Sequence, residues 1–246
     1  MPFKNVERFA NLEMKYISDF SGGYISRNKA IFDCLELNKL TQFILERCVY
    51  GTPMFKLGNK GNKILILSGI HGNELPPQIA NVRLLNELLY RKLNHTIYFI
   101  PFAAPKSTMD NRRTLNSMDL NRSAHIKNSL SSLIVQEIES LGIDFVGDFH
   151  STSFNSNPGI ESVFSSKSPS PESYLIANYI SQDLGCDVLS VDIAGSSYYG
   201  AVEDVCNLNG IPAVTGEVVC PFGVVGEGTV ERSHAQMLSF LDYFGV

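Results

Sequence analysis

The sequence predicts an α/β fold in which a central sheet carries helices on both faces. Short apolar runs recur along the chain, and helical spacing of apolar residues fills the intervals between them. The size agrees with this, because 246 residues with 44% hydrophobic and 18% charged residues are typical of a globular protein with a substantial core. Sheets of this class usually carry their chemistry at the carboxyl ends of the strands.

The expected elements alternate along the chain. We expect residues 1–60 to form a layer packed on a main domain of residues 61–246, because a turn-rich stretch at 58–63 separates the two. The main domain is then expected to contain a strand at 64–67, a helix from Pro76, a strand at 97–100, a helix at 130–141 ended by Gly142, a strand at 143–150, and a closing helix at 230–244 with Met237, Leu238 and Leu241 inward.

Residues 151–173 break this alternation. They are rich in serine, contain three prolines and lack periodicity, so they are predicted to form a long loop. Such a loop either lies on the surface or forms the wall of a site.

The composition argues against several classes of protein. The chain has 20 basic and 25 acidic residues, and the basic residues are scattered, which argues against nucleic acid as a partner. No apolar run approaches the roughly 18 residues of a membrane helix and the start lacks a signal-peptide pattern, so a cytoplasmic location without membrane contact is expected. The five cysteines are odd in number and form no C-x-x-C pair, so reduced core thiols are expected. The oligomeric state is left open.

Three potential metal ligands follow apolar strands. His71 and Glu74 lie three residues apart in a glycine-containing turn, where an imidazole and a carboxylate can converge on one cation. His150, at the end of a second apolar strand, completes a His₂Glu set of the kind that holds catalytic zinc. An ordinary surface loop is the alternative for the first pair. The remaining histidines lack such settings: His95, His125 and His234.

A polar cluster at residues 111–122 suggests recognition of anions. Arg122 can grip a carboxylate with its planar fork, and Asn121 adds a donor. An arginine of the preceding Arg112-Arg113 pair could stabilise an oxyanion. The alternative is a solvated basic loop.

Glu217 lies in a run of small and β-branched residues in a predicted strand. A carboxylate in such surroundings is either paired or has a raised pKa, which suits a general base acting on water. A partly exposed position at a strand edge is the alternative. Upstream, Tyr198 and Tyr199 either offer a phenol to a substrate or pack in the core.

Taken together and in this order, the clusters resemble the zinc carboxypeptidase superfamily, specifically its aspartoacylase and succinylglutamate desuccinylase branch. The resemblance covers about residues 64–246, and its most specific sign is Gly-x-His-Gly-Asn-Glu at 69–74. Asp119-Leu120-Asn121-Arg122 is also similar to that branch. The resemblance implies a mixed, mostly parallel sheet with helices on both faces, in a single domain with an N-terminal extension.

The resemblance also implies roles for individual residues. One zinc ion would be held by His71, Glu74 and His150, while Glu217 would act as general base and later as proton donor. Asp119 would orient the first zinc-binding histidine. Asn121 and Arg122 would bind a carboxylate beside the scissile amide. Arg113 would stabilise the oxyanion, with Arg112 as the alternative. Tyr198 or Tyr199 would contact the substrate.

The implied function is zinc-dependent hydrolysis of an amide bond next to a free carboxylate, in a small molecule or short peptide. The Gly-Asn pair in the zinc motif favours an N-acyl amino acid deacylase. Members of this branch usually carry a C-terminal β domain, for which residues 218–246 leave no room, and this favours the alternative of a metallocarboxypeptidase acting on short peptides. A third reading is a non-catalytic protein that binds a metal and carboxylates.

Overall fold

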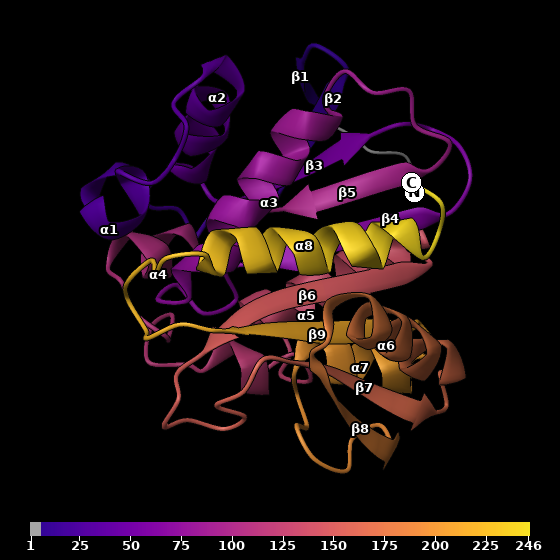
Figure 1. Cartoon of the computed structure of the whole chain (residues 1–246). Coiled ribbons are helices and arrows are strands. Elements are labelled where there is room, and N and C mark those ends of the chain that lie inside the picture. Colours follow the sequence, from indigo (N-terminus) through magenta and orange to yellow (C-terminus); the bar gives the residue numbers. More distant parts are fainter. Residues whose placement is uncertain (1–5) are drawn as a thin grey trace.

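In a computed structural model, residues 6–246 are described, and their strands form one nine-stranded sheet (Figure 1). The strand order is β1-β2-β3-β5-β4-β6-β9-β7-β8. The strands are β1 (Glu7–Phe9), β2 (Leu12–Ser18), β3 (Thr52–Leu57), β4 (Lys63–Ser68), β5 (Thr96–Ile100), β6 (Phe145–Thr152), β7 (Ser162–Ser168), β8 (Asp187–Ile193) and β9 (Ala213–Val219).

The sheet is mixed, as predicted, and its central strands are parallel. β5, β4, β6 and β9 pair in parallel, as do β7 and β8. The β1–β2, β2–β3, β3–β5 and β9–β7 pairs are antiparallel, so the sheet of the described residues has as many antiparallel as parallel pairings rather than mostly parallel ones. Because β4, β6 and β9 run in the same direction, their carboxyl ends meet at one edge of the sheet. The strands of residues 7–57 extend this same sheet through the pairing of β3 with β5.

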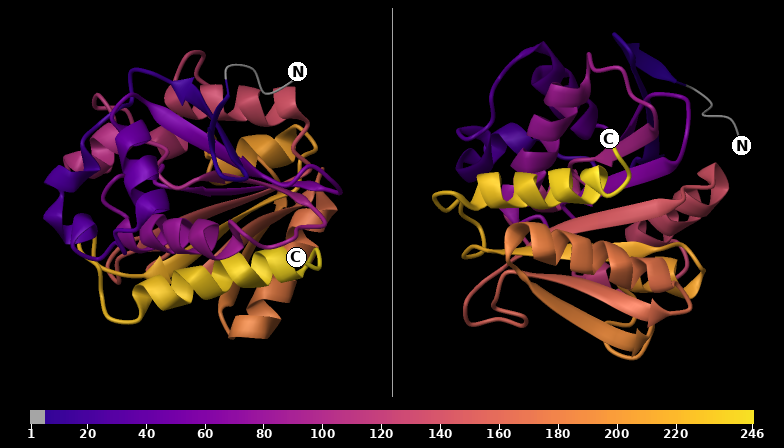
Figure 2. Two further views of the ribbon diagram at one scale, coloured as in Figure 1. Left: turned by 90° about the horizontal axis from the view of Figure 1, so that it is seen from above. Right: turned by 45° about the vertical axis from the view of Figure 1, so that its right-hand side comes forward.

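Helices cover both faces of the sheet (Figures 1 and 2). One face carries α3 (Leu75–Leu88), α6 (Pro171–Leu184) and α8 (Thr229–Asp242), with α1 (Lys29–Phe32) and α2 (Lys39–Cys48) beside α3. The other face carries α5 (Leu130–Leu141) and α7 (Val202–Leu208). α4 (Pro105–Met109) follows β5, and the 3₁₀ turns are η1 (Ile25–Arg27) and η2 (Leu120–Arg122). No helix among the described residues has the length and apolar character needed to cross a membrane.

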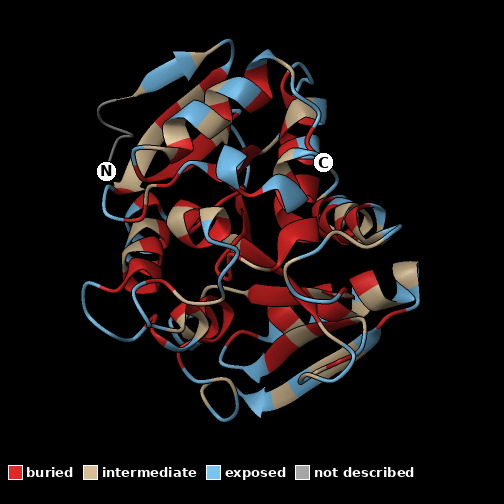
Figure 3. Ribbon diagram, turned by 90° about the vertical axis from the view of Figure 1, so that its left-hand side faces the viewer, coloured by how far each residue is buried: buried red, intermediate tan, exposed pale blue. Residues whose placement is uncertain are grey.

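The two faces of β4 explain why its sequence is apolar throughout. Ile64 and Ile66 pack in the core under α3 and α8, whereas Leu65 and Leu67 pack in the core under α5. Alternate side chains of a strand point to opposite faces, so a strand covered on both sides must be apolar at every position. The central strands are accordingly buried, while the outermost strands β1 and β8 are largely exposed (Figure 3).

The predicted strands and helices of the main domain are confirmed, and three details were wrong. Leu238 is 40% exposed, because the inward face of α8 runs through Ser233, Met237 and Phe240 instead. Residues 151–173 contain β7 and the end of β6, leaving only 153–161 as the loop between them. All five cysteines are free, but Cys34, which lies just after the short helix α1, is exposed rather than in the core.

Gly72 ties the loop after β4 to α4. A methyl group on its Cα would lie 2.1 Å from the carbonyl carbon of Ser107 and 2.3 Å from the amide nitrogen of Thr108. These are backbone atoms and cannot rotate away as a side chain would. The close approach therefore requires glycine at this position.

We expect the Gly72→Ala substitution to lower the free energy of unfolding by about 3 kcal/mol, because α4 or the loop must shift. Gly185→Ala is the matched control: its φ is +70°, but nothing lies within 4 Å of the added methyl group. The control should cost only about 1 kcal/mol, the penalty of a left-handed backbone conformation. Urea unfolding of both variants measures the difference, and equal losses would contradict the steric account.

Candidate metal centre and active site

Three predicted ligands meet at the carboxyl edge of the parallel strands. His71, Glu74 and His150 are buried, and one ligand atom from each lies within 4.8 Å of the others. The Nδ1 atoms of His71 and His150 lie 2.7 Å from Oε1 and Oε2 of Glu74, respectively. His71 and Glu74 come from the loop between β4 and α3, and His150 comes from β6 beside it. The structure thus brings all three predicted ligands together.

Each histidine has a second carboxylate on its other ring nitrogen. Asp119 Oδ1 lies 2.9 Å from Nε2 of His71, as the predicted orienting role requires. Asp148 Oδ2 lies 3.1 Å from Nε2 of His150 and is fully buried. At His71, the carboxylate of Asp119 accepts the Nε2 proton, which fixes the tautomer and leaves the Nδ1 lone pair for a metal. At His150, Asp148 lies near Nε2 as an ion-pair partner, without a hydrogen bond between them.

The charges in this cluster support one another. Burial by itself would raise the pKa of Glu74, but the two imidazoles hold it well below its usual range. Burial would likewise lower the pKa of His150, but Asp148 and Glu74 raise it well above its usual range. A similar balance keeps the pKa of Asp119 low, through His71 and Arg113. The positively charged groups around them thus keep Glu74 and Asp119 ionised.

Gln78 holds the ligand loop in shape. This residue of α3 is fully buried, and its Nε2 donates to the backbone carbonyl of Glu74 at 2.7 Å, with longer contacts to the carbonyls of His71 and Gly72. Its Oε1 accepts a hydrogen bond from the hydroxyl of Thr108. The side chain thus satisfies backbone groups that would otherwise lack partners in the protein interior.

Glu217 lies next to the cluster of His71, Glu74 and His150. It pairs with His150 across the parallel β6–β9 ladder, so the two side chains emerge on the same face of the sheet. Its Oε2 is buried and has no hydrogen-bond partner among the described residues. Burial, with the charge of Glu74 nearby, raises the pKa of Glu217 to about 8. The environment therefore favours proton uptake by this carboxylate.

The polar cluster predicted at 111–122 forms a wall of the same pocket. Arg113 donates from Nε to Asp119 at 3.2 Å, and its Nη1 lies 3.3 Å from Glu74 Oε1. Arg112 is exposed and does not line the pocket. Asn121 and Arg122 do line it from within the turn η2, and the guanidinium of Arg122 donates to the backbone carbonyl of Asn121.

The two tyrosines are separated by the fold. Tyr198 lines the pocket, donates its phenolic proton to Asn157 at 3.2 Å, and lies under the guanidinium of Arg122 at 5.3 Å. Tyr199 is exposed and packs on the ring of His125 instead.

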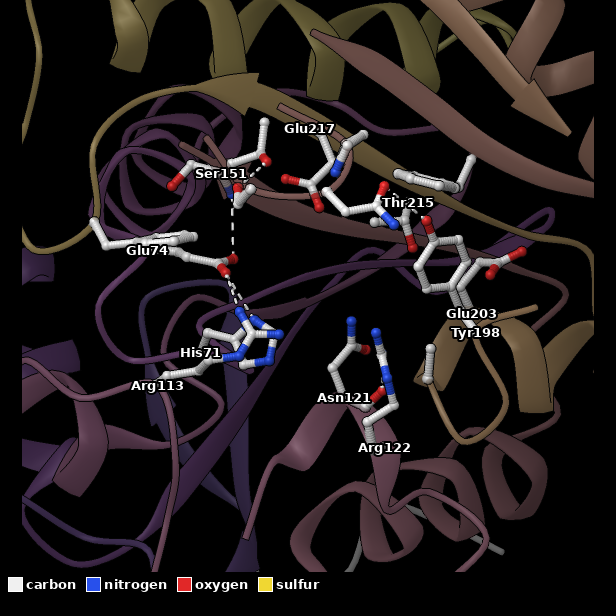
Figure 4. Close-up of a pocket in the computed structure, with 17 residues that line it drawn as sticks. His71, Glu74, Arg113, Asn121, Arg122, Ser151, Tyr198, Glu203, Thr215 and Glu217 are labelled. Atoms are coloured by element: carbon white, nitrogen blue, oxygen red, sulfur yellow. Dashed lines mark hydrogen bonds and ion pairs between the residues drawn. The ribbon is translucent and has the colours of Figure 1, made fainter. Parts of the chain in front are cut away.

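The pocket has a volume of about 290 Å³ and opens beside the ligand cluster (Figure 4). Ser156, Asn157 and Pro158 line it, so the loop at 153–161 forms part of its wall, one of the two roles expected for that region. The other wall residues not yet named are Ser151, Thr152, Phe164, Ala201, Glu203, Thr215 and Phe222.

Sequence reasoning missed three polar residues of the site. Asp148 could have been found, because it lies two positions before His150 in a strand and so points to the same face. Gln78 and Glu203 carry a weaker signal: each is a polar residue in a helix that also buries other polar side chains, Asn81 in α3 and Asp204 and Asn207 in α7. Their neighbours come from loops that are distant in the sequence and meet only in the folded chain, so the local sequence does not identify these two residues as part of the site.

The other histidines lie outside the pocket, as predicted. His95 accepts a hydrogen bond from the backbone of Asn62, and His234 lies 3.1 Å from Glu87. His125 packs on Tyr199.

Solved structures similar to this chain share its fold. An aspartoacylase family protein from Mesorhizobium loti aligns with a TM-score of 0.59 at 21% identity, over 79% of this chain and 62% of the other. A succinylglutamate desuccinylase/aspartoacylase from Rhodobacter sphaeroides aligns with a TM-score of 0.58 at 17% identity, over 79% and 59%. A metallo-carboxypeptidase from Burkholderia cenocepacia aligns with a TM-score of 0.58 at 14% identity, over 79% and 62%. The chain thus covers about three fifths of each of these proteins.

Among curated proteins, none matches the chain significantly. The family model of the succinylglutamate desuccinylase/aspartoacylase catalytic domain matches residues 60–244, which include every candidate site residue. This match spans about three quarters of the 246 residues. The chain therefore belongs to the succinylglutamate desuccinylase/aspartoacylase catalytic-domain family.

Proposed function

We propose that this protein is a zinc-dependent hydrolase that cleaves an amide bond next to a free carboxylate, with N-acyl amino acids as its substrates. The observation that carries the proposal is the convergence of three ligand atoms, from His71, Glu74 and His150, at a pocket that His71, Glu74 and Glu217 line. Membership of a family of hydrolases supports it.

The donor set suits one zinc ion. His71 would bind through Nδ1, because Asp119 accepts the proton of its Nε2. His150 would also bind through Nδ1, because that atom faces Glu74 while Nε2 faces Asp148. Glu74 contributes a carboxylate between them. Two neutral imidazoles and one carboxylate match a common catalytic zinc set. When bound there, zinc would make a water molecule acidic near neutral pH and polarise the substrate carbonyl.

The protein's own groups would supply the remaining chemistry. Glu217 would take the proton of the attacking water and later give it to the leaving amine. Arg113, whose side chain is 39% exposed and lines the pocket, would face the negative charge that develops on the carbonyl oxygen. Asn121 and Arg122 would hold the substrate carboxylate, with Tyr198 beside them.

A metallocarboxypeptidase acting on short peptides would use the same groups. The similarity to the fold of the Burkholderia cenocepacia metallo-carboxypeptidase makes this the second candidate. The two functions differ in substrate, so a panel that contains both N-acyl amino acids and short peptides separates them.

Replacing a ligand should weaken zinc binding strongly. We expect His71→Ala and His150→Ala to lower zinc affinity more than 100-fold. Losing a residue that only hydrogen-bonds to a zinc ligand already lowers metal affinity by about 10- to 100-fold. His95→Ala, outside the pocket, serves as the control and should bind zinc normally. Competition with a chelator measures the affinities, and unchanged binding in the ligand variants would refute the assigned site.

Glu217→Gln should fold and retain zinc but lower kcat by 10²- to 10⁴-fold, because the amide cannot accept the proton. The measurement is product release, by mass spectrometry, from the mixed panel. Glu227→Gln, which removes an exposed glutamate outside the pocket, is the matched control. An unchanged kcat would remove Glu217 from the mechanism. Turnover of peptides alone would favour the carboxypeptidase.

Arg122→Ala should chiefly raise KM, by about 10- to 100-fold, for substrates with a free carboxylate, because a charge-assisted contact is lost. Steady-state kinetics on each substrate and its carboxylate-amidated analogue measure the effect. If the wild-type protein hydrolyses both equally well, Arg122 does not grip the carboxylate.

A further inference from the structure

Glu203 is a buried carboxylate in the pocket wall, and the proposed reaction does not use it. It comes from α7, is 7% exposed and lines the pocket. Asn207, one turn later, donates from Nδ2 to Oε1 at 2.5 Å. Within the described part of the chain, no other group donates a hydrogen bond to Glu203, so Oε2 is left without a protein partner.

The surroundings of Glu203 are short of positive charge. Asp204 beside it is also buried, and its Oδ2 has no hydrogen-bond partner among the described residues. Asp148 is close enough to add to the negative potential. Burial first, and then the charge of Asp204, raises the pKa of Glu203 to about 8. No lysine or arginine among residues 6–246 forms an ion pair with Glu203 or Asp204.

Glu203 and the candidate metal ligands lie on opposite sides of the pocket. In Figure 4, Glu203 lies near Tyr198 and Thr215, across the pocket from His71 and Glu74. Arg122 lies over the ring of Tyr198, and its guanidinium donates a hydrogen bond to the backbone carbonyl of Asn121.

We propose that Glu203 is a specificity-determining residue that selects substrates whose side chain ends in a cation, an ammonium or a guanidinium group. This proposal rests on the proposed function. A substrate with its amide at the ligand cluster and its carboxylate at Arg122 has two further groups, the acyl group and the side chain. We place the side chain toward Glu203, because Glu203 lies near Tyr198, whose ring Arg122 covers. A cation there would supply the counter-charge that the protein does not provide.

A protonated Glu203 could instead donate a hydrogen bond to an acidic side chain. The observations favour the cation, because an acidic side chain would add another negative charge beside Asp204 and Asp148. The two ligand classes can be compared directly.

The test measures binding by calorimetry, using zinc-loaded protein that carries Glu217→Gln so that ligands are not consumed. The ligands are the Nα-acetyl derivatives of lysine, norleucine and glutamate. Lysine and norleucine have side chains of similar length and differ in the terminal ammonium. We expect the lysine derivative to bind at least tenfold more tightly than the norleucine derivative. Adding Glu203→Gln, which retains an oxygen for the Asn207 bond, should abolish that difference.

Glu227→Gln in the same background removes one negative charge outside the pocket and should preserve the lysine preference. Equal binding of the lysine and norleucine derivatives, including no binding of either, would overturn the proposal. Tightest binding of the glutamate derivative would also overturn it. If the wild-type protein hydrolyses the norleucine and lysine derivatives at equal rates, the role of Glu203 is refuted but the proposed hydrolase activity is not. Absence of turnover across the whole panel would instead count against the proposed hydrolase.

Discussion

The site depends on the contact of Glu74 with two imidazoles. Each of its oxygens lies 2.7 Å from the Nδ1 atom of a histidine, in a place that water scarcely reaches. Buried charged groups at such short distances stabilise one another only when each group is held in a geometry that pairs it with an opposite charge or a hydrogen-bond partner. The surrounding structure does this: parallel strands bring the loop and β6 together, Gln78 fixes the loop backbone, and a carboxylate backs each histidine.

Much of the fold could be predicted because its central strands are buried on both faces. The apolar run at 64–67 clearly predicted a buried strand, and the amphipathic stretch before Gly142 clearly predicted a helix. β7 was missed because Ser162–Ser168 has serine at buried positions, where its environment comes from β8 and β9 rather than from its own pattern. Leu238 was misplaced because helical spacing alone does not locate the boundary of the inward face.

The candidate site could likewise be predicted only in part. The ligand set and Glu217 could be predicted, because each lies beside a recognisable strand end and motif. The choice within Arg112-Arg113 and Tyr198-Tyr199 could not, since neighbouring residues share a motif but point in different directions. Glu203 shows the limit of local reasoning: its sequence marks it as a helix residue, and only the packing of α7 on the sheet makes it part of a pocket wall. Specificity would thus depend on residues that the motif does not include.

The most direct test of this account is anomalous diffraction at the zinc absorption edge from crystals of the zinc-loaded protein. We expect one strong peak, within about 2.0–2.2 Å of Nδ1 of His71, Nδ1 of His150 and a carboxylate oxygen of Glu74. The Nε2 atoms should stay on Asp119 and Asp148. A peak elsewhere, or zinc held through either Nε2, would contradict the central claim that these three side chains form the metal centre.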